Sequence, residues 1–214
     1  MYNPAHFEEE NPQVLHRLME QHPLATLVTL GSQGLHATQL PLFHDCSAGG
    51  FGVLRGHMAK ANPQWSDLAP GVQALTIFTG PQHYISPNWY PSKAEHAKVV
   101  PTWNYVVVHA RGSVRVIHDA AWLKKNVGEL TAAHEAAFPN PWTIEAAPDG
   151  FINHMVKAIV GIELVIESLE GKWKASQNRP EADRLGVLAA LRQLQTPEAD
   201  RMAEIVTHAN HLAK

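Results

Sequence analysis

TIFTGPQHYISPNWYPSKAEHAKVVPTWNYVVVHARG, residues 76–112, holds two runs rich in β-branched and aromatic residues, Thr76–Thr79 and Trp103–Gly112. About two dozen residues separate the runs, and four of them are prolines. A connection of this length without secondary structure is uncommon in a compact domain and is usually functional. The rest of the chain is therefore expected to form a β-rich scaffold around this segment.

Aromatic side chains are concentrated in the same stretch. They are Tyr84, Trp89, Tyr90, Trp103 and Tyr105. Their flat apolar faces and polar tips suit the wall of a site for a planar ligand or the centre of an interface. The alternative is that the rings simply fill the open end of a β-barrel, and the residues alone leave both readings open.

Composition limits the class of protein. A chain of 214 residues with 45% apolar and 17% charged residues can bury the core of one domain, with or without a small appendage. A net charge of -3 disfavours general nucleic-acid affinity, although a local basic patch stays compatible with it. Cys46 is the only cysteine, so no intrachain disulfide can form. With no apolar leader and no membrane-length run, we expect a soluble cytoplasmic protein.

The first half of the chain predicts a helix and then strands. Asn11 and Pro12 are typical of a helix start, and apolar residues at helical spacing continue to Pro23. Strands are expected over Leu24–Leu30 and Leu35–Phe43, joined by a glycine-containing hairpin turn. A third strand is expected over residues 51–55.

The segment Gly56–Trp65 predicts an anion site. Gly56 permits a sharp exit from the third strand into a helical turn, on which His57 and Lys60 share a face just after Arg55. Free backbone N–H groups at a helix start and a lysine both favour a phosphate. The alternative is that His57 caps a carbonyl group and Lys60 is solvated.

The second half of the chain predicts a similar alternation. The expected elements are a strand over Val72–Thr79, a β-rich run over Pro101–His118 with a bend or hairpin at Gly112, a helix capped by Asp119, a short helix over Asp149–Val156, a strand over Ile162–Lys174, and two helices between Glu181 and Lys214. The last two helices are divided by Gln195 and a Thr196 cap, with Pro197 at the first position of the second helix.

Sequence motifs exclude several kinds of site. His134 and Glu135 begin a zinc-binding HExxH pattern, but Phe138 occupies the last position. His208 and His211 are three residues apart near the end of the chain, and a chance surface pair explains them better than a pair of metal ligands. No GxSxG, GxxxxGK[ST] or GxGxxG motif occurs, which removes the hydrolase elbow, the P-loop and the Rossmann turn. Any nucleotide must therefore be held by barrel loops.

Four motifs occur in order between Gly56 and Pro180: GHMAKANP, YISPNWY, VPTWNY and SQNRP. Together with YNPAHF near the N-terminus and LPL in the second expected strand, they resemble the PaiB family of FMN-binding negative transcriptional regulators. The resemblance covers essentially the whole chain. It implies a mainly β fold with flanking helices, a split β-barrel of the pyridoxamine-phosphate-oxidase type, and a homodimer with FMN in clefts between the subunits. It also implies an FMN-binding domain over residues 1–180 and a helical hairpin over 181–214 packed on the barrel.

The resemblance also implies cofactor-binding residues. Arg55, His57 and Lys60 would stand at the FMN phosphate, where a dianion needs charge-assisted hydrogen bonds. Ala59 departs from the Ser or Thr that many split-barrel flavoproteins carry on the matching turn. The other expected contacts are Thr38, Gln39 and Leu40 at the isoalloxazine edge, Ser86, Trp89 and Trp103 from the aromatic segment, and Gln177 and Arg179 late in the chain.

Three functions follow from the resemblance. The first is a dimeric FMN-binding regulator, in which case promoter DNA is a candidate partner even though the sequence shows no clear recognition helix. The second is an FMN-dependent oxidoreductase acting on a small molecule, with the flavin supplying the redox chemistry. The third is a haem-binding split-barrel protein with a histidine as axial ligand.

Overall fold

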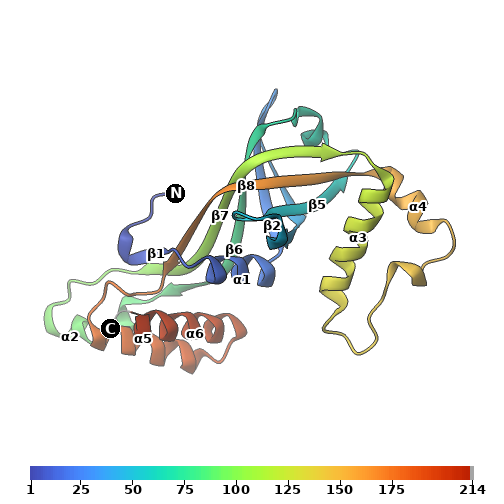
Figure 1. The fold of residues 1–214 in the computed structure, drawn as a ribbon. Coiled ribbons are helices and arrows are strands. Elements are labelled where there is room, and N and C mark those ends of the chain that lie inside the picture. Colours follow the sequence, from blue (N-terminus) through green and yellow to red (C-terminus); the bar gives the residue numbers. More distant parts are fainter. Residues whose placement is uncertain (213–214) are drawn as a thin grey trace. The chain divides into compact units, whose positions relative to one another are not determined.

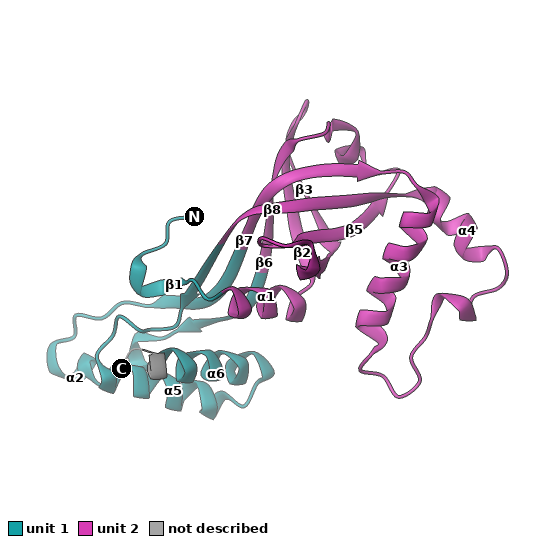
Figure 2. Cartoon of the chain, in the orientation of Figure 1, with its two compact units in different colours: residues 1–11, 79–108, 170–214 teal, residues 12–78, 109–169 magenta. Residues whose placement is uncertain are grey.

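A computed structural model describes residues 1–212 and the side chains through Ala209. The chain forms two compact units (Figure 2). Unit 1 contains Met1–Asn11, Thr79–Val108 and the chain from Glu170 onward, and unit 2 contains Pro12–Phe78 and His109–Leu169. Three long strands, β6, β7 and β8, contribute residues to both units.

The described strands form one mainly antiparallel sheet with helices beside it (Figure 1). Its order is β3-β2-β6-β7-β8-β5-β4, and β1 pairs with β8. The strands are β1 (Glu8–Glu9), β2 (Leu24–Gly31), β3 (Gly34–Pro41), β4 (Phe43–Asp45), β5 (Val53–Ala59), β6 (Val72–Ile85), β7 (Thr102–Ile117) and β8 (Ile159–Lys174). The helices are α1 (Pro12–Gln21), α2 (Ser92–His96), α3 (Ala120–Glu135), α4 (Phe151–Met155), α5 (Glu181–Leu194) and α6 (Pro197–Leu212). The expected class, mainly β with flanking helices, is confirmed.

The β2–β3 hairpin of unit 2 has one covered face and one open face. Its register pairs Ala25 with Leu40 and Leu30 with Leu35. Because paired residues of antiparallel strands point to the same side, Ala25 and Leu40 share the covered face and the two leucines share the open one. Leu30 and Leu35 are 68% and 77% exposed. The open face of this hairpin is therefore apolar.

The prediction of a helical turn after Gly56 is wrong. Strand β5 continues to Ala59, and His57 pairs with Gly161 of β8. The ladder bonds to β8 satisfy the backbone groups that a helical turn would otherwise satisfy, so long-range pairing overrides the local glycine signal. His57 and Lys60 therefore share no helical face, since His57 lies in the strand and Lys60 follows its end.

Two other expectations about strands are corrected. Strand β6 extends to Ile85, so the irregular part of the aromatic segment is shorter than expected. Gly112 is neither a bend nor a hairpin, because β7 runs without interruption through it. An added Cβ at Gly112 would lie 1.8 Å from the carbonyl oxygen of Val165. The glycine is required by the close approach of another backbone rather than by a turn.

Helix α3 of unit 2 begins as the sequence predicts. The Asp119 carboxylate accepts a hydrogen bond from the backbone N–H of Trp122 at 2.7 Å, which satisfies one of the free donors at the helix start. An added Cβ at Gly161 would lie 2.4 Å from the Trp122 ring, so this ring packs directly on β8. Helix α3 thus covers the β5–β8 face beside His57.

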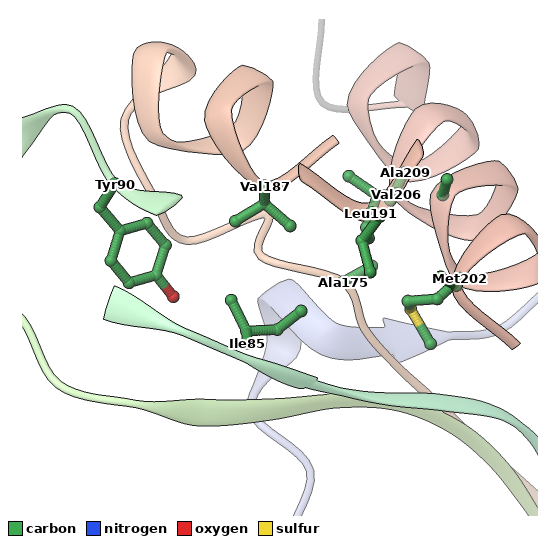
Figure 3. Close-up of a cluster of buried hydrophobic side chains, with 10 residues drawn as sticks. Ile85, Tyr90, Ala175, Val187, Leu191, Met202, Val206 and Ala209 are labelled. Atoms are coloured by element: carbon green, nitrogen blue, oxygen red, sulfur yellow. The ribbon is translucent and has the colours of Figure 1, made fainter. Parts of the chain in front are cut away.

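Unit 1 has its own apolar core, which Figure 3 shows. Val187 and Leu191 of α5 and Met202 of α6 pack with Ile85 of β6 and Tyr90. Thr196 caps α6 through a hydrogen bond from the backbone N–H of Ala199, as expected from its place before Pro197. The α5–α6 hairpin is therefore held by buried apolar side chains.

The described helices include none that is both long enough and apolar enough to span a membrane.

Candidate flavin site

Arg55 of unit 2 lies among carboxylates. Its guanidinium forms an ion pair with Asp45 at 2.8 Å and another with Glu163 at 3.3 Å, and Glu129 of α3 lies 3.9 Å away. Glu163 is 6% exposed and also accepts hydrogen bonds from Arg115. Arg55 would have to give up these partners to bind a phosphate, so the structure gives it a structural role.

His57 is oriented by β5 and has no partner for one ring nitrogen. Its Nδ1 atom is buried and forms no hydrogen bond with the described residues. Burial lowers the pKa of His57 below its usual value, because a charged imidazolium is poorly solvated there. An unpartnered buried nitrogen is costly unless a ligand or water satisfies it. No described residue therefore uses the hydrogen-bonding capacity of this buried nitrogen.

Lys60 follows the end of β5 and is exposed. Its ammonium group donates one hydrogen bond, to the backbone carbonyl of Lys157 at 2.5 Å, and its backbone N–H donates to Ala158 at 2.8 Å. An ammonium group has three donors, so two remain. Trp65 donates its indole N–H to the Lys60 carbonyl at 2.9 Å, which fixes the backbone of this turn. Lys60 is accordingly the freest of the three cations expected at the phosphate.

The three expected residues on β3 differ in their surroundings. Thr38 is held by Gln64, at 2.5 Å, and by Asn62, at 3.1 Å. Gln39 is exposed and donates to Thr26 across the hairpin at 3.3 Å. Leu40 is 4% exposed and belongs to the core. Gln39 is therefore the side chain of the three that could reach a ligand on the open face.

In unit 1 the structure brings some of the expected aromatic residues together. Trp103 is 52% exposed, and its ring meets that of Tyr84 edge to face, with 6.0 Å between centroids. Trp89 lies beside the apolar core, with its ring 6.0 Å from that of His83. The Ser86 hydroxyl accepts from the N–H of Asn88 at 3.2 Å and so caps the turn that carries Trp89. The Trp103 ring is therefore exposed to solvent, whereas Ser86 stabilises the turn that carries Trp89.

Gln177 and Arg179 also lie in unit 1. The Gln177 amide is used locally, because it accepts from the N–H of Ala175 and donates to the carbonyl of Trp173. The Arg179 guanidinium lies over the ring of Tyr90, 5.1 Å from its centroid. Arg179 forms no ion pair with any described residue. Arg179 thus carries a charge that contacts an aromatic ring but that no described carboxylate neutralises.

The sequence reading missed two lysines of unit 1, Lys172 and Lys174 on β8. Their ammonium groups lie 5.5 and 6.0 Å from the centroid of the Tyr105 ring. Lys172 is only 7% exposed. The GKWK sequence contains a usable signal, since residues two apart on a strand face the same side.

These residues divide into two groups. Thr38, Gln39, Leu40, Arg55, His57 and Lys60 lie in unit 2, and Ser86, Trp89, Trp103, Gln177 and Arg179 lie in unit 1. Within unit 2, the free donors of Lys60 and the unpartnered Nδ1 of His57 fit a phosphate group, which takes charge-assisted hydrogen bonds. Within unit 1, the open ring of Trp103 fits a flat ligand. Taken separately, unit 2 offers donors of the kind that the phosphate of FMN needs and unit 1 offers an aromatic face, and the individual roles of these residues remain predictions.

The described residues contain no group of three His, Cys, Asp or Glu side chains placed to hold a metal ion.

Comparison with known proteins identifies the family. The family described as "Putative FMN-binding domain" matches residues 1–168. An uncharacterized protein of Emericella nidulans, AN0679, is 33% identical, with 96% of each chain covered. The protease synthase and sporulation protein PAI 2 of Bacillus subtilis is 30% identical, again with 96% of each chain covered.

Solved structures agree on the fold. The flavocytochrome Anf3 from Azotobacter vinelandii superposes with a TM-score of 0.59 at 12% identity, over 78% of this chain and 69% of that one. A conserved hypothetical protein from Mycobacterium tuberculosis, Rv2991, gives a TM-score of 0.57 at 12% identity, over 85% of this chain and 95% of that one. These likenesses confirm the expected split barrel. The chain belongs to the FMN-binding domain family, and both the resemblance to PaiB and the expected FMN cofactor are confirmed with it.

Proposed function

We propose that this protein is an FMN-binding homodimer that regulates gene expression in the manner of PaiB. The observation that carries the dimer is the open apolar face of unit 2, where Leu24, Leu30 and Leu35 are 64%, 68% and 77% exposed. An apolar sheet face of this kind is costly in water and is typical of a protein interface. The full-length similarity to PAI 2, whose name refers to protease synthesis and sporulation, supports the regulatory role.

In the proposed site, Lys60 and His57 bind the FMN phosphate, and Gln39 hydrogen-bonds to the cofactor from the open face. FMN supplies redox chemistry or, in a regulator, a bound state that favours one form of the dimer. Arg55 holds β4, β5, β8 and α3 together through its carboxylate partners and does not contact the phosphate.

FMN binding is tested by titrating the full-length protein with FMN and following flavin fluorescence. Lys60→Gln should weaken binding by about 1.5–3 kcal/mol, the usual contribution of a charged hydrogen bond, or roughly 10- to 150-fold. Lys157→Gln is the matched control, because it removes an exposed charge nearby but keeps the carbonyl that Lys60 contacts. Equal FMN affinity in both variants would place the phosphate elsewhere.

The dimer is tested by analytical ultracentrifugation. We expect twice the 23.6 kDa mass of the chain for the wild type and the monomer mass for Leu30→Glu. Leu194→Glu places the same charge at another exposed leucine, 44% exposed on α5, and should leave the dimer intact. A wild-type monomer would refute this part of the proposal.

Direct promoter binding by the α5–α6 hairpin has little electrostatic support. Among the side chains that the structure describes there, the exposed charged ones are Glu181, Arg192, Glu198, Asp200, Arg201 and Glu204. The four carboxylates exceed the two guanidinium groups, whereas binding to the phosphate backbone of DNA requires an excess of positive charge. We therefore propose that the regulatory effect passes through another surface or a protein partner. The test is a gel shift at low salt with the promoter of the protein's own operon. Retardation by the wild type that is abolished in Arg192→Gln/Arg201→Gln would contradict this proposal.

FMN-dependent oxidoreduction is the second candidate. It is favoured by the exposed pair of Tyr84 and Trp103, which offers a flat apolar wall for a small substrate. Consumption of NADH or NADPH by the FMN-loaded protein, with a common electron acceptor present, would support it. No consumption with either nicotinamide would leave the regulator as the better account.

A further inference from the structure

Unit 1 contains a cavity of about 350 Å³ where β1 meets the end of β8 and helix α6. Glu8 and Glu9 of β1 line one side of it, and Trp173 of β8 and Ala209 of α6 line another. Small-molecule sites in proteins have volumes of roughly 300–1,000 Å³. The cavity is therefore large enough for a compact organic ligand.

Trp173 gives the cavity an aromatic wall with an unused hydrogen-bond donor. This residue is 8% exposed, and its indole N–H forms no hydrogen bond with any described residue. A buried indole N–H usually has a partner, and a bound molecule can supply one. Ala209, also 8% exposed, adds a small apolar side chain. The wall thus suits the apolar body of a ligand.

The Glu9 carboxylate faces the same space. Glu9 pairs with Gly171, and Trp173 lies two residues further along β8, so the Glu9 and Trp173 side chains project to the same side of the sheet. One Glu9 oxygen accepts a hydrogen bond from the backbone N–H of Asn11 at 2.9 Å. Neither Glu8 nor Glu9 forms an ion pair with a described residue. Glu9 therefore retains an oxygen and its charge for a cation.

The charges around this cavity distinguish it from a site for FMN. Among the described residues no lysine or arginine lines it, and its remaining titratable side chains are His6 and His208. A phosphate dianion placed there would meet two carboxylates without a compensating lysine or arginine, and like charges at short range repel. The cavity consequently selects a ligand of the opposite charge.

We propose that this cavity binds a small organic ammonium ion with an apolar body, with Glu9 at the ammonium group and the Trp173 ring against it. An ammonium ion over the face of an indole gains a cation–π interaction, and tryptophan is the best of the aromatic side chains for this purpose. A neighbouring carboxylate adds a charge-assisted hydrogen bond. The proposal goes beyond the flavin site and does not depend on any residue proposed for the FMN phosphate.

Isothermal titration calorimetry on the full-length protein tests the proposal, with 2-phenylethylammonium chloride as the probe near neutral pH. The neutral analogue 2-phenylethanol has the same ring and chain length but no charge. We expect the ammonium ion to bind at least tenfold more tightly than the alcohol. The affinity should be the same within twofold with and without saturating FMN, because the two ligands occupy different sites.

Variants identify the groups responsible. Glu9→Gln removes the charge but keeps an oxygen that can accept from the N–H of Asn11, and it should weaken binding of the ammonium ion at least tenfold. Glu10→Gln is the matched control, because Glu10 is exposed and adjacent in sequence but does not line the cavity. Trp173→Phe keeps an aromatic ring without the indole N–H and should weaken binding at least threefold.

Three results would overturn the proposal. The first is the absence of saturable binding of 2-phenylethylammonium to the wild type, and the second is equal affinity for the neutral alcohol. The third is an affinity of Glu9→Gln within twofold of that of Glu10→Gln. Displacement of the ammonium ion by FMN, or altered FMN affinity in Glu9→Gln, would instead assign the cavity to the cofactor and refute a separate site. Failure of FMN to bind would leave each of these comparisons decisive.

Discussion

Replacing Arg55 with methionine distinguishes a structural role from a role in cofactor binding. The sequence places Arg55 at the FMN phosphate, whereas the structure surrounds its guanidinium with Asp45, Glu163 and Glu129. The methionine keeps the apolar stem and removes the charge. We therefore expect Arg55→Met to lower the stability of the fold and to leave FMN affinity within about twofold of the wild type.

The expected loss of stability depends on the partners that Glu163 and Asp45 keep after the Arg55 guanidinium is removed. Removing one member of a buried ion pair usually costs about 3–5 kcal/mol, because the other charge is left alone. Here Glu163 retains Arg115, and Asp45 retains the N–H of Ser47 at 2.9 Å. The loss should therefore fall to about 2–3 kcal/mol. For a chain of this size, 1 kcal/mol corresponds to roughly 2–4 °C in Tm, so a decrease of about 4–12 °C is expected.

Thermal unfolding followed by far-UV circular dichroism measures the first effect, and FMN titration measures the second. Arg115→Met is the matched control, because Arg115 contacts the same Glu163 but its side chain is 62% exposed. An exposed ion pair contributes at most about 1 kcal/mol, so this control should lower Tm by no more than about 4 °C. The structural assignment of Arg55 is refuted if Arg55→Met unfolds at the same temperature as Arg115→Met while binding FMN at least tenfold more weakly.

Three other perturbations test the fold. Gly112→Ala should lower the free energy of unfolding by more than about 3 kcal/mol, because the new Cβ meets the Val165 carbonyl. Gly128→Ala in helix α3 should leave the stability unchanged or raise it slightly, because the nearest neighbour of the new Cβ lies at 3.4 Å. Urea denaturation measures both effects. Burial and the neighbouring His44 on β4 lower the pKa of His16. As the pH falls, His16 is therefore protonated in the unfolded chain before it is protonated in the folded one. The free energy of unfolding should consequently fall as the pH drops below about 6.5. His16→Phe should flatten that dependence, and an unchanged pH profile would exclude His16 as its source. Leu191→Ala should cost about 2–5 kcal/mol, since this side chain is fully buried between the helices of unit 1, and a loss below 1 kcal/mol would contradict that packing.

The family and the cofactor could be predicted from the sequence, but the role of each site residue could not. The motifs around Lys60, Trp103 and Arg179 pointed to the family and to FMN, which the comparisons confirm. The state of each side chain depended on partners distant in the chain. Arg55 meets Glu163, 108 residues later, and Lys174 meets the carbonyl of Trp103, 71 residues earlier. Ion-pair and hydrogen-bond partners so distant in the chain leave no local pattern.

Local sequence signals predicted the longer strands and helices in their order, the Asp119 and Thr196 caps, and the family, but not β1, α2 or the separate strand β4. These features rest on local chemistry, namely side-chain periodicity, capping hydrogen bonds and short motifs. Long-range contacts, in contrast, decide that β5 continues through His57, that β7 passes straight through Gly112, and that Lys172 and Lys174 of β8 lie beside Tyr105. Strand pairing satisfies backbone groups and brings charged side chains together from residues far apart in the sequence. Local propensity has no influence over such separations.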